Sequence, residues 1–408
     1  MKIIDLFAGA GGLSEGFRRA GFDVASHVEM NIAAALTLKT REAYYYCLEH
    51  EFIDNYITYI TGGIEREQFY NLIPNEILAK VINEEISTDT FASITERINE
   101  LLDGDDVLGI IGGPPCQAYS LAGRSRDRDR MENDPRNYLY QYYLQFIEYY
   151  HPTFFVFENV QGLLSAQNGQ IFGTIQERMR ELGYTIDHRL LNSNDFGVIQ
   201  SRKRIIIIGW RSDQNLEYPN FDNEELEYSI RDLFADLPSI HAGETNNIYN
   251  TTANECLRSL KIRSNYWNTL TYHTSRPNNN NDLEIYRHCC SVWNTEQTHL
   301  KYCDLPTHLM THRNSKAFLD RFKVIDYNGI SHTIVAHIAK DGHHFIHPDI
   351  NQNRSLTVRE AARIQSFSDD YFFENSRTSA FQQIGNAVPP LMAEKIALAI
   401  RQLLEDNN

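Results

Sequence analysis

Short apolar runs alternate with helix-like stretches along the first half of the chain. The runs occupy residues 3–7, 24–28, 107–111, 154–157 and 205–208, and helical patterns lie between most of them. Two parallel strands need a crossover connection, which is usually a helix. The alternation therefore predicts an α/β fold in which a parallel sheet is covered by helices.

Two long segments interrupt this alternation. Residues 41–102 look mostly helical and are far longer than the usual connection of about 2 to 6 residues, so we interpret them as a helical insertion. Residues 211–350 are rich in Tyr, Asn and His and show weak periodicity, which predicts a separate, smaller domain. Helix-like periodicity then resumes. We therefore expect residues 1–210 and 351–408 to form one large domain around the smaller one.

The composition is that of a globular protein, with 42% hydrophobic and 23% charged residues. No segment reaches about 18 uninterrupted apolar residues, and Asp5 interrupts the first apolar run. We therefore expect a soluble, cytoplasmic protein without membrane association. The six cysteines form no Cys-x-x-Cys pair, so any cysteine chemistry should be that of a single thiol.

The formal net charge of -16 argues at first against a nucleic-acid partner, because phosphate binding needs local Lys and Arg. Net charge is a global sum, however, and basic residues gather in two places. These are Arg124, Arg126, Arg128 and Arg130 in one segment, and Arg202, Lys203 and Arg204 in another. The composition leaves a DNA or RNA partner open.

A glycine-rich turn follows the first apolar run. Gly9-Ala10-Gly11-Gly12 stands between that run and a helix-like stretch from Leu13 to Ala20. Glycines let the backbone approach a cofactor, and the N-terminus of the next helix favours an anionic group. Glu29 closes the second run, where an acid commonly accepts hydrogen bonds from ribose hydroxyls. The pattern indicates a nucleoside cofactor; the alternative is a structural turn with a surface acid.

A cysteine follows the third apolar run. Cys116 comes directly after Gly112-Gly113-Pro114-Pro115, which predicts a thiol on a rigid turn at the carboxyl end of a strand. A buried cysteine is more often a small apolar side chain. The two glycines and two prolines favour a functional thiol.

Charged residues mark the next two apolar runs. Glu158 directly follows residues 154–157, while Arg202 and Arg204 precede residues 205–208. A carboxyl group that can share a proton, placed beside a thiolate nucleophile, is a functional combination. The alternatives are that Glu158 caps a helix or is solvated, and that the arginines keep a sheet edge soluble.

Five short blocks stand in order along the chain. They are Asp5–Gly12 (DLFAGAGG), Gly113–Gln117 (GPPCQ), Glu158–Val160 (ENV), Gln200-x-Arg202-x-Arg204 and Gln383–Pro390 (QIGNAVPP). Together they resemble the ordered motifs of the cytosine-5 DNA methyltransferases, and Arg354–Phe367 (RSLTVREAARIQSF) resembles another. The resemblance implies a Rossmann-like S-adenosylmethionine-dependent methyltransferase sheet with an inserted target-recognition domain at 211–350.

The resemblance also implies a role for each block. Cys116 would add to C6 of a cytosine, and Glu158 would hydrogen-bond N3 and the exocyclic amine of that ring. Arg204 would bind the cytosine O2, and Arg202 would help position a loop or a phosphate. S-adenosylmethionine would be the methyl donor. Its expected contacts are Phe7, Ala10, Gly12, Glu29, Met30, Pro115, Asn386 and Val388.

A cytosine inside a duplex must leave the stack before its C6 can be attacked. Residues 118–136, with Gly123 as a hinge, fit a loop that closes over DNA, and the alternative is an ordinary solvated loop. The compact length resembles that of bacterial restriction-modification enzymes. We therefore expect a monomer that acts on double-stranded DNA in the nucleoid and pairs functionally with a restriction endonuclease.

Two other functions stay open. A tRNA cytosine-5 methyltransferase shares the catalytic blocks, but that branch carries a Cys-Phe-Thr motif, and no cysteine here is followed by Phe-Thr. A catalytically silent DNA-binding homologue is the second alternative. The intact Cys116, Glu158 and Arg204 argue against it.

The chain departs from the family pattern at one expected cofactor residue. The family usually has an aspartate after the third strand of its cofactor half, and the nearest match here is Glu85-Ile86. The segments around His288–Cys290 and His343–His347 lack the ligand spacing of a metal site, so we expect no metal.

Overall fold

The computed structural model describes residues 1–114, 139–214, 216–221, 224–310 and 319–407, apart from the side chains of residues 167 and 168. The chain divides into two compact units. The first unit contains Met1–Phe196, Arg202–Glu224 and Ala387–Asn408, and the second contains Gly197–Ser201 and Glu225–Asn386.

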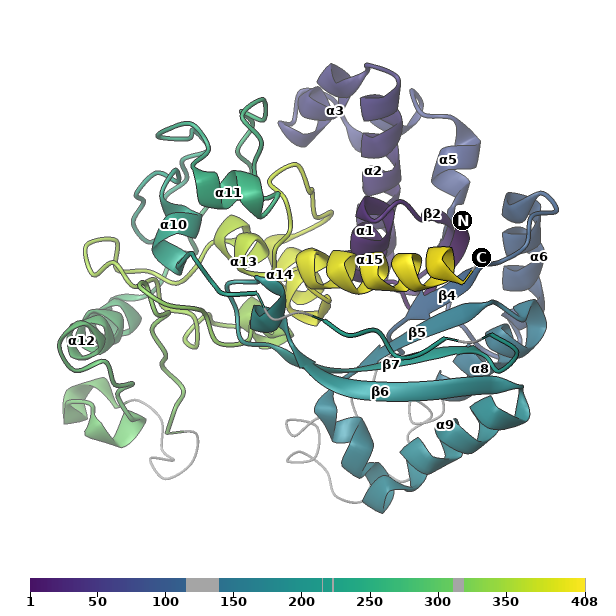
Figure 1. The fold of residues 1–408 in the computed structure, drawn as a ribbon. Coiled ribbons are helices and arrows are strands. Elements are labelled where there is room, and N and C mark those ends of the chain that lie inside the picture. The colour runs from purple at the N-terminus through teal and green to yellow at the C-terminus, as the bar shows by residue number, and fades with distance from the viewer. Residues whose placement is uncertain (115–138, 215, 222–223, 311–318, 408) are drawn as a thin grey trace. The chain divides into compact units, whose positions relative to one another are not determined.

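A seven-stranded sheet forms the centre of the first unit (Figure 1). Its strand order is β3-β2-β1-β4-β5-β7-β6. Strands β1 to β5 run parallel to one another, whereas β7 is antiparallel to both β5 and β6. The strands are β1 (Lys2–Leu6), β2 (Asp23–Val28), β3 (Val81–Ile82), β4 (Gly109–Gly112), β5 (Phe154–Asn159), β6 (Tyr184–Asn192) and β7 (Lys203–Arg211).

Helices cover both faces of this sheet (Figure 1). On one face, apolar residues of α6, α8 and α9 pack with alternate strand residues such as Ile4, Phe155 and Ile207. On the other face lie α1, α2 and α15, and Phe17 of α1 stacks on Phe154. The helices of the first unit are α1 (Gly12–Arg19), α2 (Ile32–Glu49), α3 (Ile53–Ile60), α4 (Arg66–Tyr70), α5 (Asn75–Ala79), α6 (Phe91–Leu102), α8 (Leu139–Tyr150), α9 (Gln170–Glu181) and α15 (Pro390–Asp406).

The second unit contains shorter helices. Around α12, Tyr286 and Cys290 pack with Phe322 and Ile346 in an apolar cluster.

No helix among the described residues of either unit is long and apolar enough to span a bilayer. The helices of the second unit are α10 (Ile230–Phe234), α11 (Glu255–Ser259), α12 (Asn280–Glu296), α13 (Val358–Ile364) and α14 (Arg377–Asn386). Short 3-10 helices are η2 (Gln161–Gly169) and η3 (Ser193–Phe196) in the first unit, and η4 (Tyr302–Asp304), η5 (Thr307–Leu309) and η6 (Ala336–Ala339) in the second.

The α/β fold with a Rossmann-like sheet is confirmed, but the expectation of a fully parallel sheet is wrong at one end. The run at 205–208 belongs to β7, which is antiparallel. Strand β6 was not expected because its sequence is largely polar. It is an edge strand that pairs only with β7 in the described sheet, and every residue after Tyr184 is exposed or half-buried, so it lacks an apolar run.

The segment 41–102 is not a single helical insertion. It is mostly helical, but it also contains β3, which pairs with β2, and α6, which covers the sheet. The first of its helices, α2, already begins at Ile32. Because β3 has only two residues, its apolar signal is too short to be read as a strand.

The chain returns to the first unit later than the expected residue 351. Residues 351–386 belong to the second unit, and the return begins at Ala387. The physical reason is a set of buried ion pairs within the second unit. Arg363 of α13 contacts Asp236, so the segment after residue 350 supplies part of that unit's interior.

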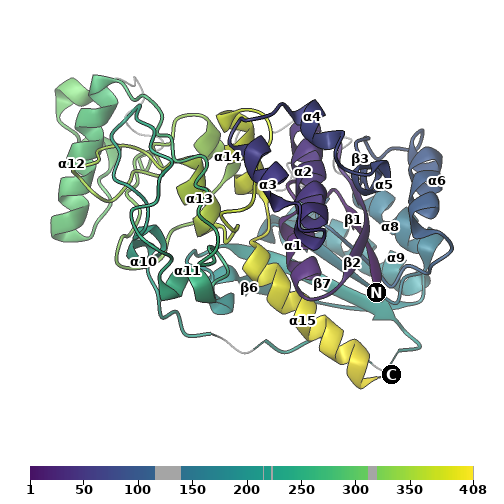
Figure 2. The same cartoon turned by 90° about the horizontal axis from the view of Figure 1, so that it is seen from above.

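Two glycines let α1 approach the C-terminal segment closely (Figure 2). A Cβ on Gly12 would lie 2.1 Å from the carbonyl oxygen of Val388, and one on Gly16 would lie 2.4 Å from the Cβ of Ala393. At the far end of the pair, Arg401 Nη1 donates to the carbonyl oxygen of Ala20 at 3.1 Å. The contact of α1 with α15 therefore depends on these positions carrying no side chain.

Gly16→Ala should destabilise the protein by about 1 to 3 kcal/mol, because the added methyl group meets backbone atoms of α15 that cannot rotate away. Thermal unfolding would measure this as a lower Tm. The matched control is Gly173→Ala in α9, where nothing lies within 4 Å of the added Cβ and alanine is the better helix former. Equal Tm values for Gly16→Ala and the wild type would contradict the packing argument.

Candidate active site

Neighbouring strands β1, β4 and β5 end at one edge of the sheet. In the register, Gly112 of β4 pairs with Leu6 of β1 on one side and with Phe157 of β5 on the other. The Gly9–Gly12 turn follows β1, and β5 carries Glu158 next to its last residue. Ligands of open α/β sheets bind outside this edge. The expected cofactor and catalytic residues therefore start from adjacent strand ends.

The turn after β1 has a left-handed backbone at three positions. The φ angles are 55° at Phe7, 55° at Gly9 and 77° at Gly11. The Gly11 amide donates to the carbonyl oxygen of Ala8 at 2.9 Å, which closes the turn. Ala10 is buried, whereas the space that a Cβ on Gly9 would occupy holds no atom within 4 Å. A backbone hydrogen bond therefore closes the turn, and the space next to Gly9 is free of other atoms of the protein that the structure describes.

Glu29, directly after β2, holds this turn through its carboxylate. Its Oε2 accepts a hydrogen bond from the Gly9 amide at 2.8 Å, and its Oε1 accepts one from the Asn31 amide at 2.7 Å. Burial raises the pKa of Glu29, although the backbone donors oppose the rise. Next to it, Met30 exposes 58% of its surface. An exposed apolar side chain beside a carboxylate suits the base and sugar of a nucleoside.

The expected cofactor contacts do not all lie in one unit. Phe7, Gly12, Glu29 and Val388 belong to the first unit, where Gly12 lies against Val388. Asn386 is the last residue of α14 in the second unit. Pro115 lies outside the described residues.

Glu158 and Arg204 form an ion pair at the end of β5 and the start of β7. Arg204 Nε lies 2.7 Å from Glu158 Oε1, and both side chains are largely but not fully buried. A Cβ on Gly113 would lie 2.7 Å from Glu158 Oε2, so the turn after β4 approaches the carboxylate at a glycine. Glu158 is therefore neither a helix cap nor a solvated strand end.

Asn159, the next residue, reaches the segment that leads to the expected nucleophile. Its Nδ2 donates to the carbonyl oxygen of Pro114 at 3.2 Å, and both residues are buried. Cys116 follows two residues later and lies outside the described residues, as do residues 118–136. The described part of the turn thus places the start of this segment beside Glu158 and Asn159.

Arg202 is fully buried and stands before β7. Its amide donates to Ser193 Oγ at 3.1 Å, and its carbonyl accepts from the Ser193 amide at 3.0 Å. Burial lowers the pKa of Arg202 well below its usual value, and the charge of Arg204 adds to this. The expected phosphate contact does not fit a fully buried guanidinium. The sheet-edge alternative is also wrong, because β7 lies between β5 and β6.

Gln200 joins three of the sequence blocks inside the second unit. Its Nε2 donates to the carbonyl oxygen of Ile364 at 3.2 Å and to Gln365 Oε1 at 2.6 Å, and its Oε1 accepts from the Ile334 amide at 2.7 Å. Gln365 Nε2 in turn donates to the carbonyl oxygen of Ile384 at 2.6 Å. Gln200 and Gln365 are therefore fully buried with hydrogen-bonded side-chain amides.

The arginines of the Arg354–Phe367 block are buried in ion pairs. Arg354 Nη2 lies 2.6 Å from Glu360 Oε1, while Arg363 lies 2.6 Å from Asp236 and 2.5 Å from Asp369. Burial favours the neutral form of Asp369, but the charge of Arg363 outweighs it and lowers the pKa. Arg354 and Arg363 therefore stabilise the second unit rather than face a ligand.

Sequence reasoning missed a buried charged cluster on the cofactor side of the sheet. His27 Nδ1 lies 3.3 Å from Asp5 Oδ2, and its Nε2 lies 3.2 Å from Glu42 Oε1 on α2. Glu42 also pairs with Arg18 of α1. Burial opposes protonation of His27, but the hydrogen bonds and charges of Asp5 and Glu42 outweigh it and raise its pKa. The available signal was polar residues inside two otherwise apolar strands.

Four of the described cysteines are buried, and their environment makes them poor nucleophiles. Burial raises the pKa of Cys47 to about 11 and that of Cys256, Cys289 and Cys290 to about 12. Cys303 is exposed. In the part of the chain that the structure describes, no three His, Cys, Asp or Glu side chains gather as a metal site would require.

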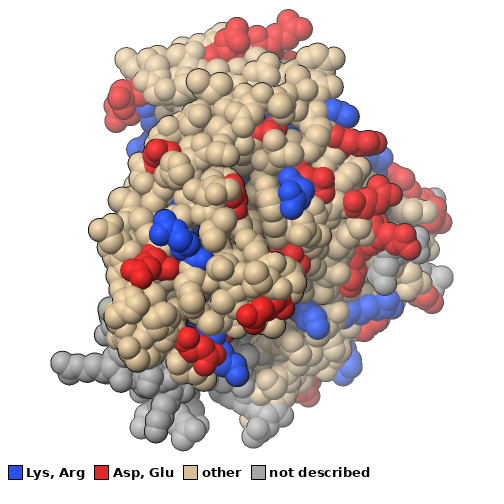
Figure 3. Space-filling model, turned by 90° about the vertical axis from the view of Figure 1, so that its left-hand side faces the viewer, with Lys and Arg blue, Asp and Glu red and all other residues tan. Residues whose placement is uncertain are grey.

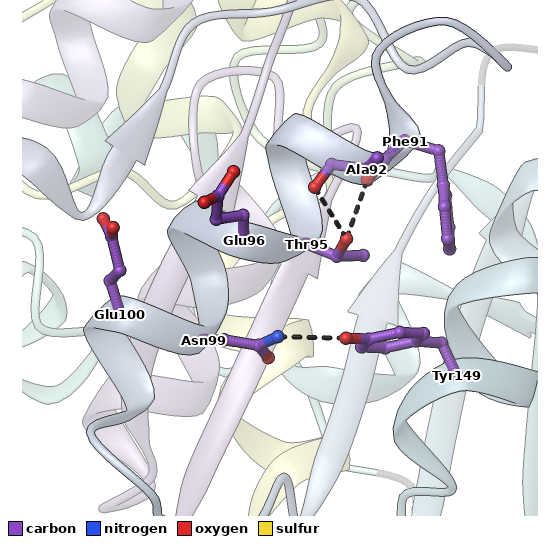
Figure 4. A pocket seen from close by; sticks show the side chains of 7 residues that line it. All are labelled: Phe91, Ala92, Thr95, Glu96, Asn99, Glu100 and Tyr149. Atoms are coloured by element: carbon purple, nitrogen blue, oxygen red, sulfur yellow. Dashed lines mark hydrogen bonds between the residues drawn. The ribbon is translucent and has the colours of Figure 1, made fainter.

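A surface hollow of about 680 Å³ lies between α6 and α8 (Figure 4). Asn99 Nδ2 donates to the Tyr149 hydroxyl across it at 3.0 Å. Its lining consists of Phe91, Ala92, Thr95, Glu96, Asn99, Glu100 and Tyr149. None of these residues follows a strand end or belongs to a sequence block, so the hollow is not the candidate active site.

The strand order is that of a Rossmann-like α/β fold, and Glu158 lies at one of its strand ends. The sequence model of the C-5 cytosine-specific DNA methylases matches residues 1–71 and 56–402. The chain therefore belongs to this family, as its motifs predicted, and is a DNA cytosine-5 methyltransferase. Within the family it groups with type II methyltransferases of bacterial restriction-modification systems.

Similar proteins cover the whole chain. Type II methyltransferase M.Bpa9945I of Bacillus paralicheniformis is 41% identical over 100% of both chains. Type II methyltransferase M.DdeI of Desulfomicrobium norvegicum is 32% identical over 100% of this chain and 90% of its own.

Solved structures are similar in fold. One, described as a prophage-encoded DNA modification methyltransferase (E. coli), has a TM-score of 0.65 at 23% identity and covers 99% of each chain. The methyltransferase EhMeth of Entamoeba histolytica has a TM-score of 0.55 at 15% identity, over 100% of this chain and 99% of its own. At these identities the likeness concerns the fold alone.

His27→Gln should destabilise the protein more at pH 6 than at pH 9. The folded state raises the pKa of His27 above its usual value near 6.5, so its stabilising contribution is complete below about pH 6.5 and is lost as pH rises through the folded pKa. Thermal unfolding of both proteins at the two pH values would measure this as a gap in Tm. Histidines with lowered pKa, such as His347, are present in both proteins and cancel in the difference. A gap that is constant with pH would contradict the protonated cluster.

Proposed function

We propose that the enzyme transfers a methyl group from S-adenosylmethionine to C5 of a cytosine flipped out of double-stranded DNA, through a covalent bond between C6 and Cys116. It acts as a monomer and protects host DNA from a cognate restriction endonuclease. Membership of the family supports the reaction, and the names of the similar type II methyltransferases support the restriction-modification role. The geometry at the strand ends supports the residue assignments.

The observation that carries the residue assignment is the Glu158–Arg204 pair beside the turn that leads to Cys116. The 2.7 Å contact fixes the carboxyl group, and Gly113 leaves no side chain between it and the turn. Asn159 holds the Pro114 carbonyl two residues before Cys116. A nucleophile, a carboxyl group and a guanidinium thus start from one edge, which suits a pyrimidine ring with several polar atoms.

The described cysteines strengthen the choice of Cys116. Only the thiolate is a nucleophile, and the four buried thiols have raised pKa values, so little thiolate forms on them. Cys303 is exposed and lies in the second unit, away in sequence from every block. Cys116 is the one cysteine that follows a strand end in the sequence, and the neighbouring strand β5 carries Glu158.

The residues after β1 and β2 fit S-adenosylmethionine. Gly9 presents open backbone, Glu29 presents a carboxylate edge held by two amides, and Met30 presents an exposed apolar side chain. Phe7, Ala10, Gly12, Pro115, Asn386 and Val388 would complete the site. When bound, the cofactor supplies an electrophilic methyl group on a sulfonium.

The chain's own groups activate the cytosine ring. The Cys116 thiolate adds to C6, and Glu158 gives or shares a proton at N3 as negative charge develops there. Arg204 holds O2 and keeps Glu158 oriented, while Arg202 supports the strand from its buried position. C5 would then take the methyl group, with the thioether S-adenosylhomocysteine as the leaving group. The C5 proton would pass to water, and the C5–H electrons would restore the ring double bond as the Cys116 thiolate leaves C6, which releases 5-methylcytosine.

Residues 211–350 serve target recognition in this proposal. Residues 225–350 of this range form most of the second unit, which also includes the segment up to Asn386, whereas residues 211–224 belong to the first unit. A tRNA substrate and a catalytically silent homologue are the alternatives. The match to the DNA methylase model over nearly the whole chain favours DNA, and the paired Glu158 and Arg204 favour an active enzyme.

Incubation with methyl-labelled S-adenosylmethionine and either duplex DNA or tRNA tests the substrate class. Label should appear in 5-methylcytosine of the duplex and not in tRNA. Cys116→Ala should lower the rate by at least about 1000-fold while binding of the cofactor is kept. Glu158→Gln should lower it by about 100-fold or more, since the amide cannot provide the proton at N3.

The matched control is Cys303→Ala, which removes an exposed thiol elsewhere in the chain and should leave the rate unchanged. Turnover by Cys116→Ala at the wild-type rate would exclude it as the nucleophile. Label in tRNA alone would replace the DNA assignment by the RNA one.

A further inference from the structure

Asn83 stands directly after β3, where the pairing of β3 with β2 would otherwise stop. The amide of Glu29 donates to the carbonyl oxygen of Ile82 at 3.1 Å, which is the last backbone bond of this ladder. Asn83 then extends the pairing with its side chain. Its Nδ2 donates to the carbonyl oxygen of Glu29 at 2.8 Å and to that of Met30 at 3.1 Å.

These two bonds hold the backbone whose side chains the cofactor site uses. The Glu29 carboxylate is fixed from the other side by the amides of Gly9 and Asn31. The Glu29-Met30 segment therefore has two sets of hydrogen bonds. The Gly9 and Asn31 amides bind the Glu29 carboxylate, and Asn83 binds the two backbone carbonyl oxygens. Met30, which is exposed, has no comparable packing to fix its direction and depends on the backbone beneath it.

The neighbours of Asn83 face elsewhere. Glu84 lies 3.7 Å from Arg97 and accepts from Ser93 Oγ at 3.4 Å, so it is directed to α6. Glu85, the expected match to the family aspartate, is exposed, and its carbonyl accepts from Thr90 Oγ1 at 2.6 Å. Of the three polar residues after β3, Asn83 donates its side-chain hydrogen bonds to the segment that follows β2.

We propose that Asn83 is a positioning residue of the cofactor site, which fixes the Glu29-Met30 segment in the conformation that binds S-adenosylmethionine. This inference rests on the proposed function. An asparagine is suited to the task because one amide nitrogen offers two donors to two carbonyl oxygens. Aspartate has the same shape but offers only acceptors, so it would set a negative charge against both carbonyls.

Calorimetric titration of the full chain with S-adenosylhomocysteine, the demethylated product, tests the proposal without catalysis. Asn83→Ala should raise the Kd about tenfold, and Asn83→Asp about 50-fold or more, since the latter adds repulsion to the loss of two hydrogen bonds. The KM for S-adenosylmethionine should rise in parallel, while kcat on duplex DNA changes less than about twofold.

The matched control is Asn99→Asp on α6. Asn99 is also exposed and donates one side-chain bond, to Tyr149, in the hollow of Figure 4, so its substitution should leave the Kd unchanged. Hydrogen exchange in the unliganded protein supplies a second readout. Amides of residues 28–32 should exchange faster in Asn83→Ala than in the wild type.

A wild-type Kd and unchanged exchange in both Asn83 variants would overturn the positioning role while leaving the proposed function intact. A fall in kcat with an unchanged Kd would overturn it as well. Failure of the wild-type protein to bind S-adenosylhomocysteine would overturn both this inference and the proposed cofactor.

Discussion

Three parallel strands that end side by side are the constraint on which the site depends. Because β1, β4 and β5 are neighbours, the glycine turn, the Gly113-Pro114 turn and Glu158 start from one sheet edge. Glycine is required where these parts approach most closely, at Gly12 against Val388 and at Gly113 against Glu158. The strand order therefore brings the candidate site residues to one sheet edge, and side-chain contacts such as that of Glu158 with Arg204 then fix their positions.

Buried charge is the second organising feature, and in each unit several of the buried charged groups form ion pairs. In the first unit, ion pairs of Asp5, His27 and Glu42 link β1 and β2 to α2. In the second unit, the buried pair of Arg363 and Asp236 links α13 to the segment that follows α10. On the face shown in Figure 3, acidic and basic side chains lie in small separate groups, and neither sign covers a broad area of the described surface. The net charge of -16 is therefore not concentrated on that face.

The sequence predicted the fold class, the family and the strand-end positions of Glu29, Glu158 and Arg204, because ordered motifs and apolar runs are local signals. It did not predict β3 or β6, since a two-residue strand and a polar edge strand carry no apolar run. It placed the return to the first unit too early, because ion pairs between residues over 100 positions apart, such as Arg363 and Asp236, leave no local pattern. For the same reason it did not single out Asn83, whose partners lie 53 and 54 residues away.

Covalent trapping tests the central claim most directly. A duplex that contains 5-fluorocytosine at the target cannot lose the C5 substituent after methylation, so the bond between C6 and the thiol should persist. With S-adenosylmethionine present, the account predicts a denaturation-resistant protein–DNA adduct that maps to Cys116 and is absent in Cys116→Ala. The account would be contradicted if the duplex carried 5-fluorocytosine at the position that the enzyme methylates and still formed no covalent bond with the wild-type protein.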